Sequence, residues 1–213
     1  MTKKQRYEAV IAYFKETMPV AETELHFAND FQLLVAVMLS AQCTDKRVNM
    51  VTPALFDAFP TVEAMAAATE DEVLAYVKSV SYPNSKAKHL VETARQLVER
   101  FSGEVPGTLE ELTSLPGVGR KTANVVMSVA FGQARMAVDT HVFRVSHRIG
   151  LVGEKAKTPL AVELELMKHF PEAIIPKAHH WLILHGRSVC TALKPQCMEC
   201  GLQSSCVYYK KKS

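Results

Sequence analysis

Apolar residues recur along most of the chain at the three- and four-residue spacing of one helix face. Two clear stripes are formed by Tyr7, Val10, Ile11 and Phe14 and by Leu33, Leu34, Val37 and Met38. Side chains at this spacing lie on one side of an α-helix, where they can pack against a core. We find no convincing alternation of apolar and polar residues, which is typical of half-buried strands. The pattern predicts an all-α protein of about ten short helices.

Residues that favour helix ends divide this pattern into short elements. Candidate N-caps are Thr44, Thr61, Thr69 and Thr158, and Thr108 with Glu111 has the spacing of a capping box. Such a hydroxyl accepts a hydrogen bond from a backbone N–H group of the first turn. Helix ends are expected where glycine and proline occur: Pro60, 103–107, 116–119, Gly132, 150–153, Pro171 and Pro176. No internal repeat and no flexible linker is found, which argues against a solenoid.

The composition is that of a compact globular protein. Of 213 residues, 48% are hydrophobic and 22% are charged, which indicates neither disorder nor a fibrous repeat. The net charge of +3 is a weak indication of an anionic partner, because polyanion binding depends on a local basic face. Residues 1–7 lack a secretory signal pattern, and no apolar run reaches the roughly 20 residues of a membrane helix. We therefore expect a cytoplasmic protein.

Four of the five cysteines lie near the C-terminus: Cys190, Cys197, Cys200 and Cys206. Separations of six, two and five residues let one short loop place four thiolates around a single centre. All-thiolate coordination suits a [4Fe–4S] cluster, whereas zinc sites usually pair two C-x-x-C knuckles or combine Cys with His. Spacing alone favours iron–sulfur over zinc only modestly. The polar residues between these cysteines argue against four buried unliganded thiols, and we expect the fifth, Cys43, to be unliganded.

The segment Leu115–Lys121, with the sequence LPGVGRK, lies between two helix patterns at 108–114 and 122–131. Its two glycines permit a tight turn whose N–H groups point outward, next to the positive end of the following helix. A phosphate can bind at such a turn, and the contact would position a nucleic acid without reading its sequence. An ordinary loop between two helices fits the same residues.

Lys121 and Asp139 are the candidate catalytic pair. The dipole of the helix that follows the turn disfavours a cation in its first turn, so the position of Lys121 has little structural reason. Nearby positive charge and partial burial would favour its neutral amine, which can attack C1′ of a deoxyribose to give a Schiff base. A solvated surface lysine is the alternative interpretation. Asp139 precedes a helix pattern, so it can equally be a plain N-cap.

Together, residues 115–122 and 138–144 resemble the helix-hairpin-helix, Gly/Pro-loop and aspartate signature of the endonuclease III superfamily. The resemblance covers nearly the whole chain and extends through 39–42, 44–45, 84–87, 125–126, 179–182 and 185–187 to the four cysteines at the spacing of the family. It implies that these cysteines hold a [4Fe–4S] cluster, which makes zinc a minor alternative. It also implies a helical barrel at 26–134 and an iron–sulfur domain formed by 1–25 and 135–213.

By the same resemblance, DNA lies across the cleft between the two lobes with the target nucleotide flipped out. Lys121 is then the nucleophile, and Asp139 assists its attack and stabilises the cationic sugar. The implied enzyme is a bifunctional DNA glycosylase and AP lyase that removes oxidised pyrimidines and associates with the nucleoid while acting on DNA. We expect it to act on duplex DNA as a monomer. Further DNA contacts are implied for Gly117, Val118, Gly119, Thr122 and His141.

Two more residues resemble family positions that enter the DNA. Gln42 matches the residue that fills the gap left by the flipped base, and its amide can bond the orphaned partner base. Tyr82 lies where the usual Gly-Leu/Phe-Tyr-Asn-Ser-Lys segment of the family reads Ser81-Tyr82-Pro83-Asn84-Ser85-Lys86. Its ring could stack between bases, but Pro83 stiffens the loop.

Three other functions fit part of the sequence. The adenine-mismatch branch of the superfamily shares the hairpin, the aspartate and the cluster but typically lacks the lysine, so Lys121 argues against it. It also usually has a further C-terminal domain, whereas here seven residues follow Cys206. A non-catalytic helix-hairpin-helix module would not need both Lys121 and Asp139. An iron–sulfur electron carrier would need neither the hairpin nor the chain length.

Overall fold

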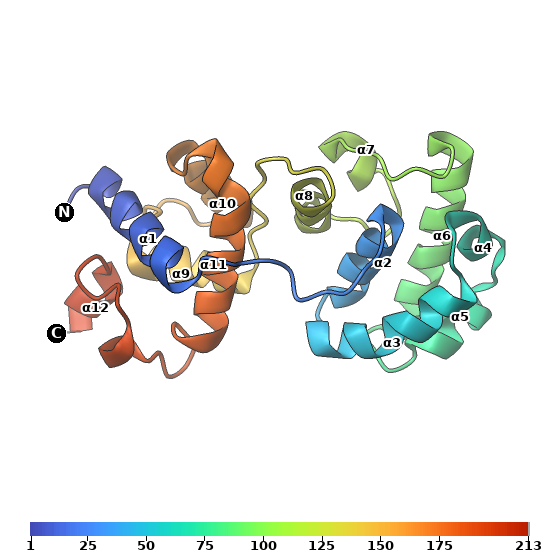
Figure 1. Ribbon diagram of the computed structural model, residues 1–213, viewed down its shortest axis with the longest axis horizontal. Helices are drawn as coiled ribbons and strands as arrows, with labels where there is room; N and C mark the ends of the chain where they lie inside the picture. Colours follow the sequence, from blue (N-terminus) through green and yellow to red (C-terminus); the bar gives the residue numbers. More distant parts are fainter. Residues whose placement is uncertain (213) are drawn as a thin grey trace. The chain divides into compact units, whose positions relative to one another are not determined.

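A computed structural model describes residues 1–212 of the chain, which contain helices and no strand. The all-α prediction is confirmed (Figure 1). The helices are α1 (Lys3–Thr17), α2 (Asp30–Ser40), α3 (Asp45–Ala58), α4 (Val62–Ala67), α5 (Glu70–Val77), α6 (Pro83–Phe101), α7 (Leu109–Thr113), α8 (Arg120–Val129), α9 (Thr140–Ile149), α10 (Pro159–His169), η1 (Glu172–Ile174), α11 (Ile175–Ser188), η2 (Cys197–Glu199) and α12 (Val207–Lys212). None of these helices is long and apolar enough to cross a membrane.

The expected threonine caps are present. Thr44, Thr61, Thr69 and Thr158 each accept a hydrogen bond from a backbone N–H group in the first turn of α3, α4, α5 and α10. Thr108 caps α7 in the same way, but the capping box expected there is incomplete. Its hydroxyl donates to Glu111 Oε2 at 2.6 Å, so this carboxylate bonds the side chain of the cap rather than its backbone N–H group.

The chain divides into two compact units, residues 24–131 and residues 1–23 with 132–213. The middle unit is built around α2, whose residues 33–39 are all buried. Helices α3, α6 and α8 pack against α2, and α4 and α5 pack on α6 (Figure 1). A helix that is apolar on every side is stable only when neighbours cover all of it, which explains why the run at 31–39 is central.

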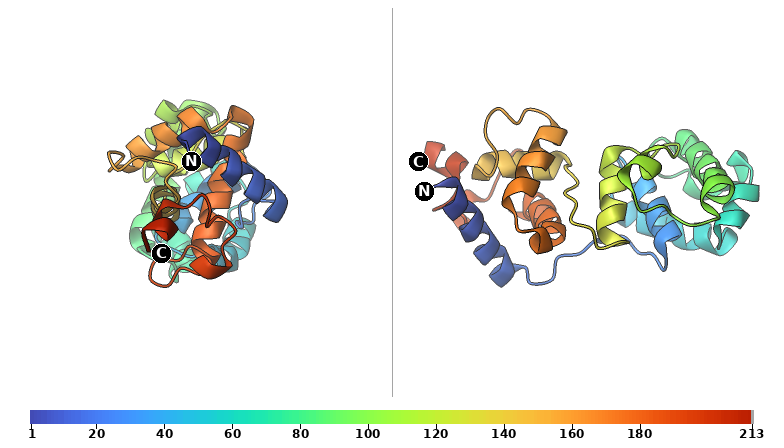
Figure 2. Two further views of the ribbon diagram at one scale, coloured as in Figure 1. Left: turned by 90° about the vertical axis from the view of Figure 1, so that its left-hand side faces the viewer. Right: turned by 90° about the horizontal axis from the view of Figure 1, so that it is seen from above.

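The other unit joins the N-terminal helix to the last third of the chain. Phe14 of α1 stacks on Trp181 of α11 at 5.7 Å between ring centroids. Arg6 donates to the carbonyl oxygen of Ser205, just before α12, at 2.9 Å, and Figure 2 shows both termini in this unit. The predicted domains, 26–134 and 1–25 with 135–213, stay a prediction. Close packing within a unit does not show that the unit folds independently as a domain.

Candidate functional site

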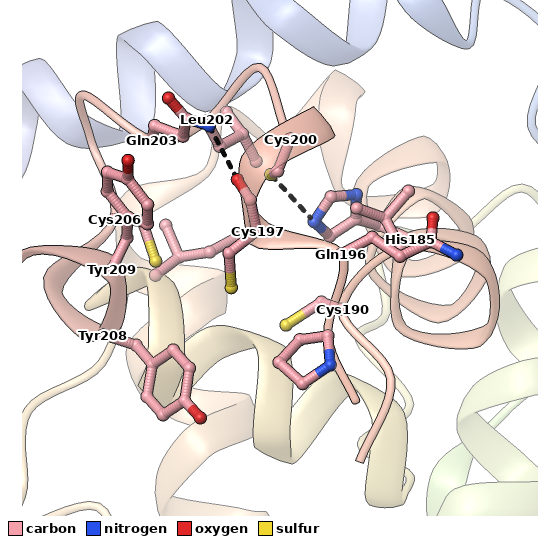
Figure 3. A pocket seen from close by; sticks show the side chains of 13 residues that line it. His185, Cys190, Gln196, Cys197, Cys200, Leu202, Gln203, Cys206, Tyr208 and Tyr209 are labelled. Carbon is pink, nitrogen blue, oxygen red and sulfur yellow. Dashed lines mark hydrogen bonds between the residues drawn. The ribbon is translucent and has the colours of Figure 1, made fainter. Parts of the chain in front are cut away.

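The four clustered cysteines line one pocket in the second unit. Cys190 follows α11, Cys197 lies in η2, Cys200 ends η2 and Cys206 precedes α12. Ile149, His185, Leu202 and Tyr208 are among the other residues that line it (Figure 3). The space they enclose amounts to ≈ 350 Å³, including the part that is open to solvent. The structure therefore brings together the four thiols that the sequence placed on one loop.

Two arginines of α9 fix this loop. Arg148 donates to the carbonyl oxygens of Thr191 at 2.6 Å and Ala192 at 2.8 Å. Arg144 donates to the carbonyl oxygen of Cys190 at 3.2 Å. Arg148 Nη1 also lies 3.6 Å from the sulfur of Cys190, so a guanidinium faces the thiol group directly. The loop conformation thus depends on a helix more than 40 residues earlier in the chain.

The pocket suits a polynuclear centre with thiolate ligands. Burial, followed by repulsion from the other cysteines, raises the pKa of Cys200, and burial likewise raises that of Cys206. Four thiolates at this place therefore need a compensating cationic centre. The four cysteines line the same pocket, and all-thiolate coordination suits a [4Fe–4S] cluster.

His185 is a second side chain that faces the pocket. It is 1% exposed, and its Nε2 lies 3.8 Å from the sulfur of Cys200 (Figure 3). Burial lowers the pKa of His185 to about 4, so the imidazole is neutral at physiological pH. A neutral ring protonated on Nε2 donates to the Cys200 sulfur. The sequence interpretation gave no role to His185, Arg144 or Arg148, although the spacing of the two arginines places them on one face of α9.

The helix-hairpin-helix is formed by α7, the turn at 115–119 and α8. The Val118 N–H group donates to the carbonyl oxygen of Leu115 at 3.2 Å and closes the turn. Thr93 of α6 donates to the carbonyl oxygen of Pro116 at 2.8 Å and ties the turn to the helical core of this unit. The side chains of Val118 and Thr122 are buried, so a DNA contact at these positions would come from the backbone.

Gly117 and Gly119 differ in how far the turn requires glycine at each position. Gly117 has φ +73°, and a Cβ there would lie 2.7 to 2.9 Å from the side chain of His89. We expect Gly117→Ala to lower the free energy of unfolding by at least about 2 kcal/mol, because the left-handed backbone and this clash both oppose it. Urea unfolding measures the change. Near-wild-type stability of Gly117→Ala would contradict the described turn.

Gly119→Ala is the matched control. Gly119 caps α8 with an extended backbone of φ −87°, and a Cβ there would meet no atom within 4 Å among residues 1–212, its chain neighbours aside. We expect this variant to lose about 1 kcal/mol or less, the difference between glycine and alanine at an N-cap. The open space beside Gly119 is also where an anion could approach the first turn of α8.

Lys121 and Asp139 belong to different units. Lys121 is exposed in the first turn of α8. Asp139 is half-buried and caps α9, with its Oδ1 accepting from the Val142 N–H group at 2.8 Å. Within residues 1–212 its second carboxylate oxygen makes no hydrogen bond. Asp139 is thus an N-cap, one of the two roles that the sequence suggested for it. Its second carboxylate oxygen can still accept a hydrogen bond or a proton. That it faces Lys121 stays a prediction.

Three of the residues expected to contact DNA can be described by their backbone conformation or their side-chain contacts. Gln42 and Tyr82 both adopt left-handed conformations, with φ of 53° and 56°, and Tyr82 is 65% exposed. A left-handed backbone is uncommon for residues other than glycine and often marks a functional position. His141 is half-buried, with its Nδ1 3.2 Å from Arg144 Nη2. Their contacts with DNA stay predictions.

Comparison with known proteins agrees with this arrangement. Residues 35–172 match the family model of HhH-GPD superfamily base excision DNA repair proteins, and residues 190–206 match the iron–sulfur binding domain of endonuclease III. Endonuclease III of Rickettsia felis is 48% identical over 200 residues, which cover 94% of this chain and 93% of that protein. Endonuclease III of Escherichia coli is 44% identical over 211 residues, which cover 99% of each chain.

The fold is also that of solved endonuclease III structures. The structure of a trapped covalent intermediate of endonuclease III with DNA, an estranged-adenine complex, matches with a TM-score of 0.93 and 42% identity. The match covers 100% of this chain and 99% of that one. A non-covalent complex of endonuclease III with DNA matches equally well. The chain therefore belongs to the endonuclease III family, the DNA glycosylases and AP lyases of base excision repair that carry an iron–sulfur cluster.

Proposed function

We propose that this protein removes oxidised pyrimidines from duplex DNA and then cleaves the strand on the 3′ side of the abasic site. The observation that carries the proposal is the exposed amine of Lys121 directly after the hairpin, in a chain with a nearly complete match to endonuclease III. A purely structural lysine has little reason to be at this helix terminus. The trapped covalent complex known for a 42% identical relative adds support.

The chemistry begins with the neutral amine of Lys121. Its lone pair attacks C1′ while the bond from C1′ to the damaged base breaks, and the base leaves with the bonding electrons and takes up a proton. The attached nitrogen then loses a proton and regains a lone pair. This lone pair forms the C=N bond of a Schiff base as the C1′–O4′ bond breaks and O4′ gains a proton.

The Schiff base makes strand cleavage possible because it acidifies the C2′ proton. Loss of this proton supplies the electrons of a C2′=C3′ double bond as the C3′–O3′ bond breaks and the 3′ phosphate departs. Water then hydrolyses the imine, which frees Lys121 and leaves an unsaturated aldehyde on the cleaved strand.

Asp139 has the electrostatic role in this scheme. A carboxylate stabilises the positive charge that develops on the sugar as the base departs. Its N-cap bond to Val142 fixes the rotamer through Oδ1, so the second oxygen is presented in a defined direction. The same carboxylate can accept a proton from the ammonium of Lys121 and so generate the attacking amine.

The hairpin and the two left-handed residues would hold the opened duplex. N–H groups around Gly117 and Gly119, with the positive end of α8, suit a phosphate and give no sequence preference. Gln42 would bond the orphaned base, Tyr82 would stack beside it, and His141 would contact the strand from the other unit.

Cys190, Cys197, Cys200 and Cys206 are the proposed ligands of the [4Fe–4S] cluster. When bound, such a cluster supplies a rigid cross-link of the loop and a redox-active centre. Arg148 and His185 would each donate a hydrogen bond toward a ligand sulfur, at Cys190 and Cys200. Donors of this kind fix thiolate ligands and shift the reduction potential of a cluster.

The test is a product analysis with purified protein, expected to act as a monomer, on duplex DNA with one thymine glycol. We expect strand cleavage without added alkali, leaving the unsaturated aldehyde on one fragment and a 5′ phosphate on the other. An intact abasic strand that breaks only in alkali would show base removal without the lyase step. Removal of adenine from a mismatch instead would favour the adenine-mismatch branch, and binding without any product would favour a non-catalytic module.

A further inference from the structure

Gln42 and Tyr82 have a backbone conformation that local sequence does not favour. They are two of the three non-glycine residues with positive φ among residues 1–212. The third, Ser102, is the C-cap of α6, where such a conformation is ordinary. Gln42 takes a position after α2 where glycine is usual, and Tyr82 precedes a proline, which normally favours extended backbone. Interactions from elsewhere in the fold must therefore hold both residues.

Ser81 provides the first of these interactions. Its hydroxyl donates to the carbonyl oxygen of Gln42 at 2.6 Å, across 39 residues of sequence. The segment that carries Tyr82 is thereby joined directly to the backbone of Gln42. The family motif that this segment resembles has glycine where Ser81 stands, and glycine has no side chain for such a bond. This hydrogen bond thus arises in the same three positions, Ser81, Tyr82 and Pro83, at which the chain differs from the family motif.

Lys86 provides the second interaction. Its side chain is buried, and Nζ donates to the carbonyl oxygens of Leu39 and Ala41, both at 2.7 Å. These carbonyls belong to the end of α2, which leads directly into Gln42. The backbone N–H group of Lys86 donates to the carbonyl oxygen of Tyr82 at 3.1 Å in the first turn of α6. One residue therefore bonds to both segments.

We propose that Ser81 and Lys86 are positioning residues that hold Gln42 and Tyr82 as one preformed probe for the opened duplex. Pro83 at the first position of α6 adds to this rigidity, because its ring fixes the backbone that follows Tyr82. A probe that is already ordered loses little conformational entropy when it enters DNA, so more of the binding energy remains for base flipping. The inference rests on the proposed function, in which Gln42 fills the gap left by the flipped base and Tyr82 stacks beside the orphaned base.

The first test uses Ser81→Ala, with Ser79→Ala as a matched control. Ser79 is an exposed serine two residues earlier in the same loop. In single-turnover excision of thymine glycol from duplex DNA, we expect Ser81→Ala to be slower by about fivefold, the typical loss for one hydrogen bond. Ser79→Ala should keep the wild-type rate. A 2-aminopurine base opposite the lesion should also respond less to Ser81→Ala, because its fluorescence reports how the orphaned base is held.

The second test uses Lys86→Met, with Lys88→Met as a control of equal charge change. Lys88 lies on α6 with an exposed side chain. We expect Lys86→Met to slow duplex excision by about tenfold or more, because two bonds from a charged donor are lost. Lys86→Arg, which keeps donors for both carbonyls, should recover most of the rate. If the site required only an apolar side chain of this volume, Lys86→Met would excise thymine glycol faster than Lys86→Arg.

Trapping on single-stranded abasic DNA with borohydride separates positioning from chemistry or folding. This substrate has no orphaned base, so Ser81→Ala and Lys86→Met should both be trapped as efficiently as the wild type. An equal loss on single-stranded and duplex DNA would overturn the proposal, as would equal duplex rates for Ser81→Ala and Ser79→Ala. Absence of a trapped complex with the wild-type protein on either DNA form would instead contradict the Schiff-base function itself.

Discussion

Lys121→Gln should abolish the borohydride-trapped complex and slow the excision of thymine glycol by on the order of 10³-fold or more, because the nucleophile is lost. Glutamine has a similar length and polarity but an amide nitrogen that cannot form an imine. Lys121 is exposed and its side chain makes no hydrogen bond or ion pair within residues 1–212, so the variant should fold normally. Single-turnover kinetics on a duplex substrate measures the loss, and a thermal unfolding curve checks the fold.

Lys121→Arg is the informative partner of this variant. It keeps the positive charge and the attraction to phosphate, but its guanidinium is always protonated and is not a nucleophile. We expect wild-type affinity for the abasic duplex together with no trapped complex. Lys88→Gln, on an exposed face of α6, should behave as the wild type. Full excision by either Lys121 variant would show that another residue attacks the sugar.

Cys197→Ser should cost the protein its iron and sulfide. We expect about four irons per chain in the wild type, the composition of a [4Fe–4S] cluster, and a large loss of iron and of the visible colour in the variant. Loss of the cross-link should also lower the thermal midpoint by about 5 °C or more. Iron and sulfide analysis and the visible spectrum measure the first effect, and calorimetry measures the second.

Cys43→Ser is the matched control for this experiment. Cys43 lies in the other unit, next to Gln42, and does not line the cysteine pocket. The same atomic change there should leave iron content and colour at wild-type levels. One zinc per chain with no colour in the wild-type protein would contradict the cluster assignment. Equal loss of iron from Cys43→Ser would contradict the assignment of ligands.

Local features of the fold were predictable because they depend on residues close in sequence. The caps at Thr44 and Thr69 are bonds across three residues, and the hairpin at 115–119 is closed by its own turn. The cysteine loop was predictable for the same reason, since its four cysteines lie between residues 190 and 206. Such features follow from backbone geometry and side-chain type alone.

The supporting contacts were not predictable because they join distant parts of the chain. Arg148 meets Thr191 across 43 residues, and Lys86 meets Leu39 across 47. The spacing of residues in the sequence does not predict such pairs, because their contact depends on the tertiary fold. His185 showed no signal as a neighbour of Cys200, since a histidine on a helix face is more often part of the core. Lys121 is exposed in the first turn of α8, and its catalytic role stays a prediction.

The central claim is that Lys121 attacks the sugar, and borohydride trapping followed by peptide mapping tests it most directly. Wild-type protein is mixed with a thymine glycol duplex, reduced, digested and analysed by mass spectrometry. The account predicts one DNA-linked peptide, with the adduct on Lys121. An adduct on another lysine or on the N-terminal amine, or a cleaved strand without any adduct, would contradict it.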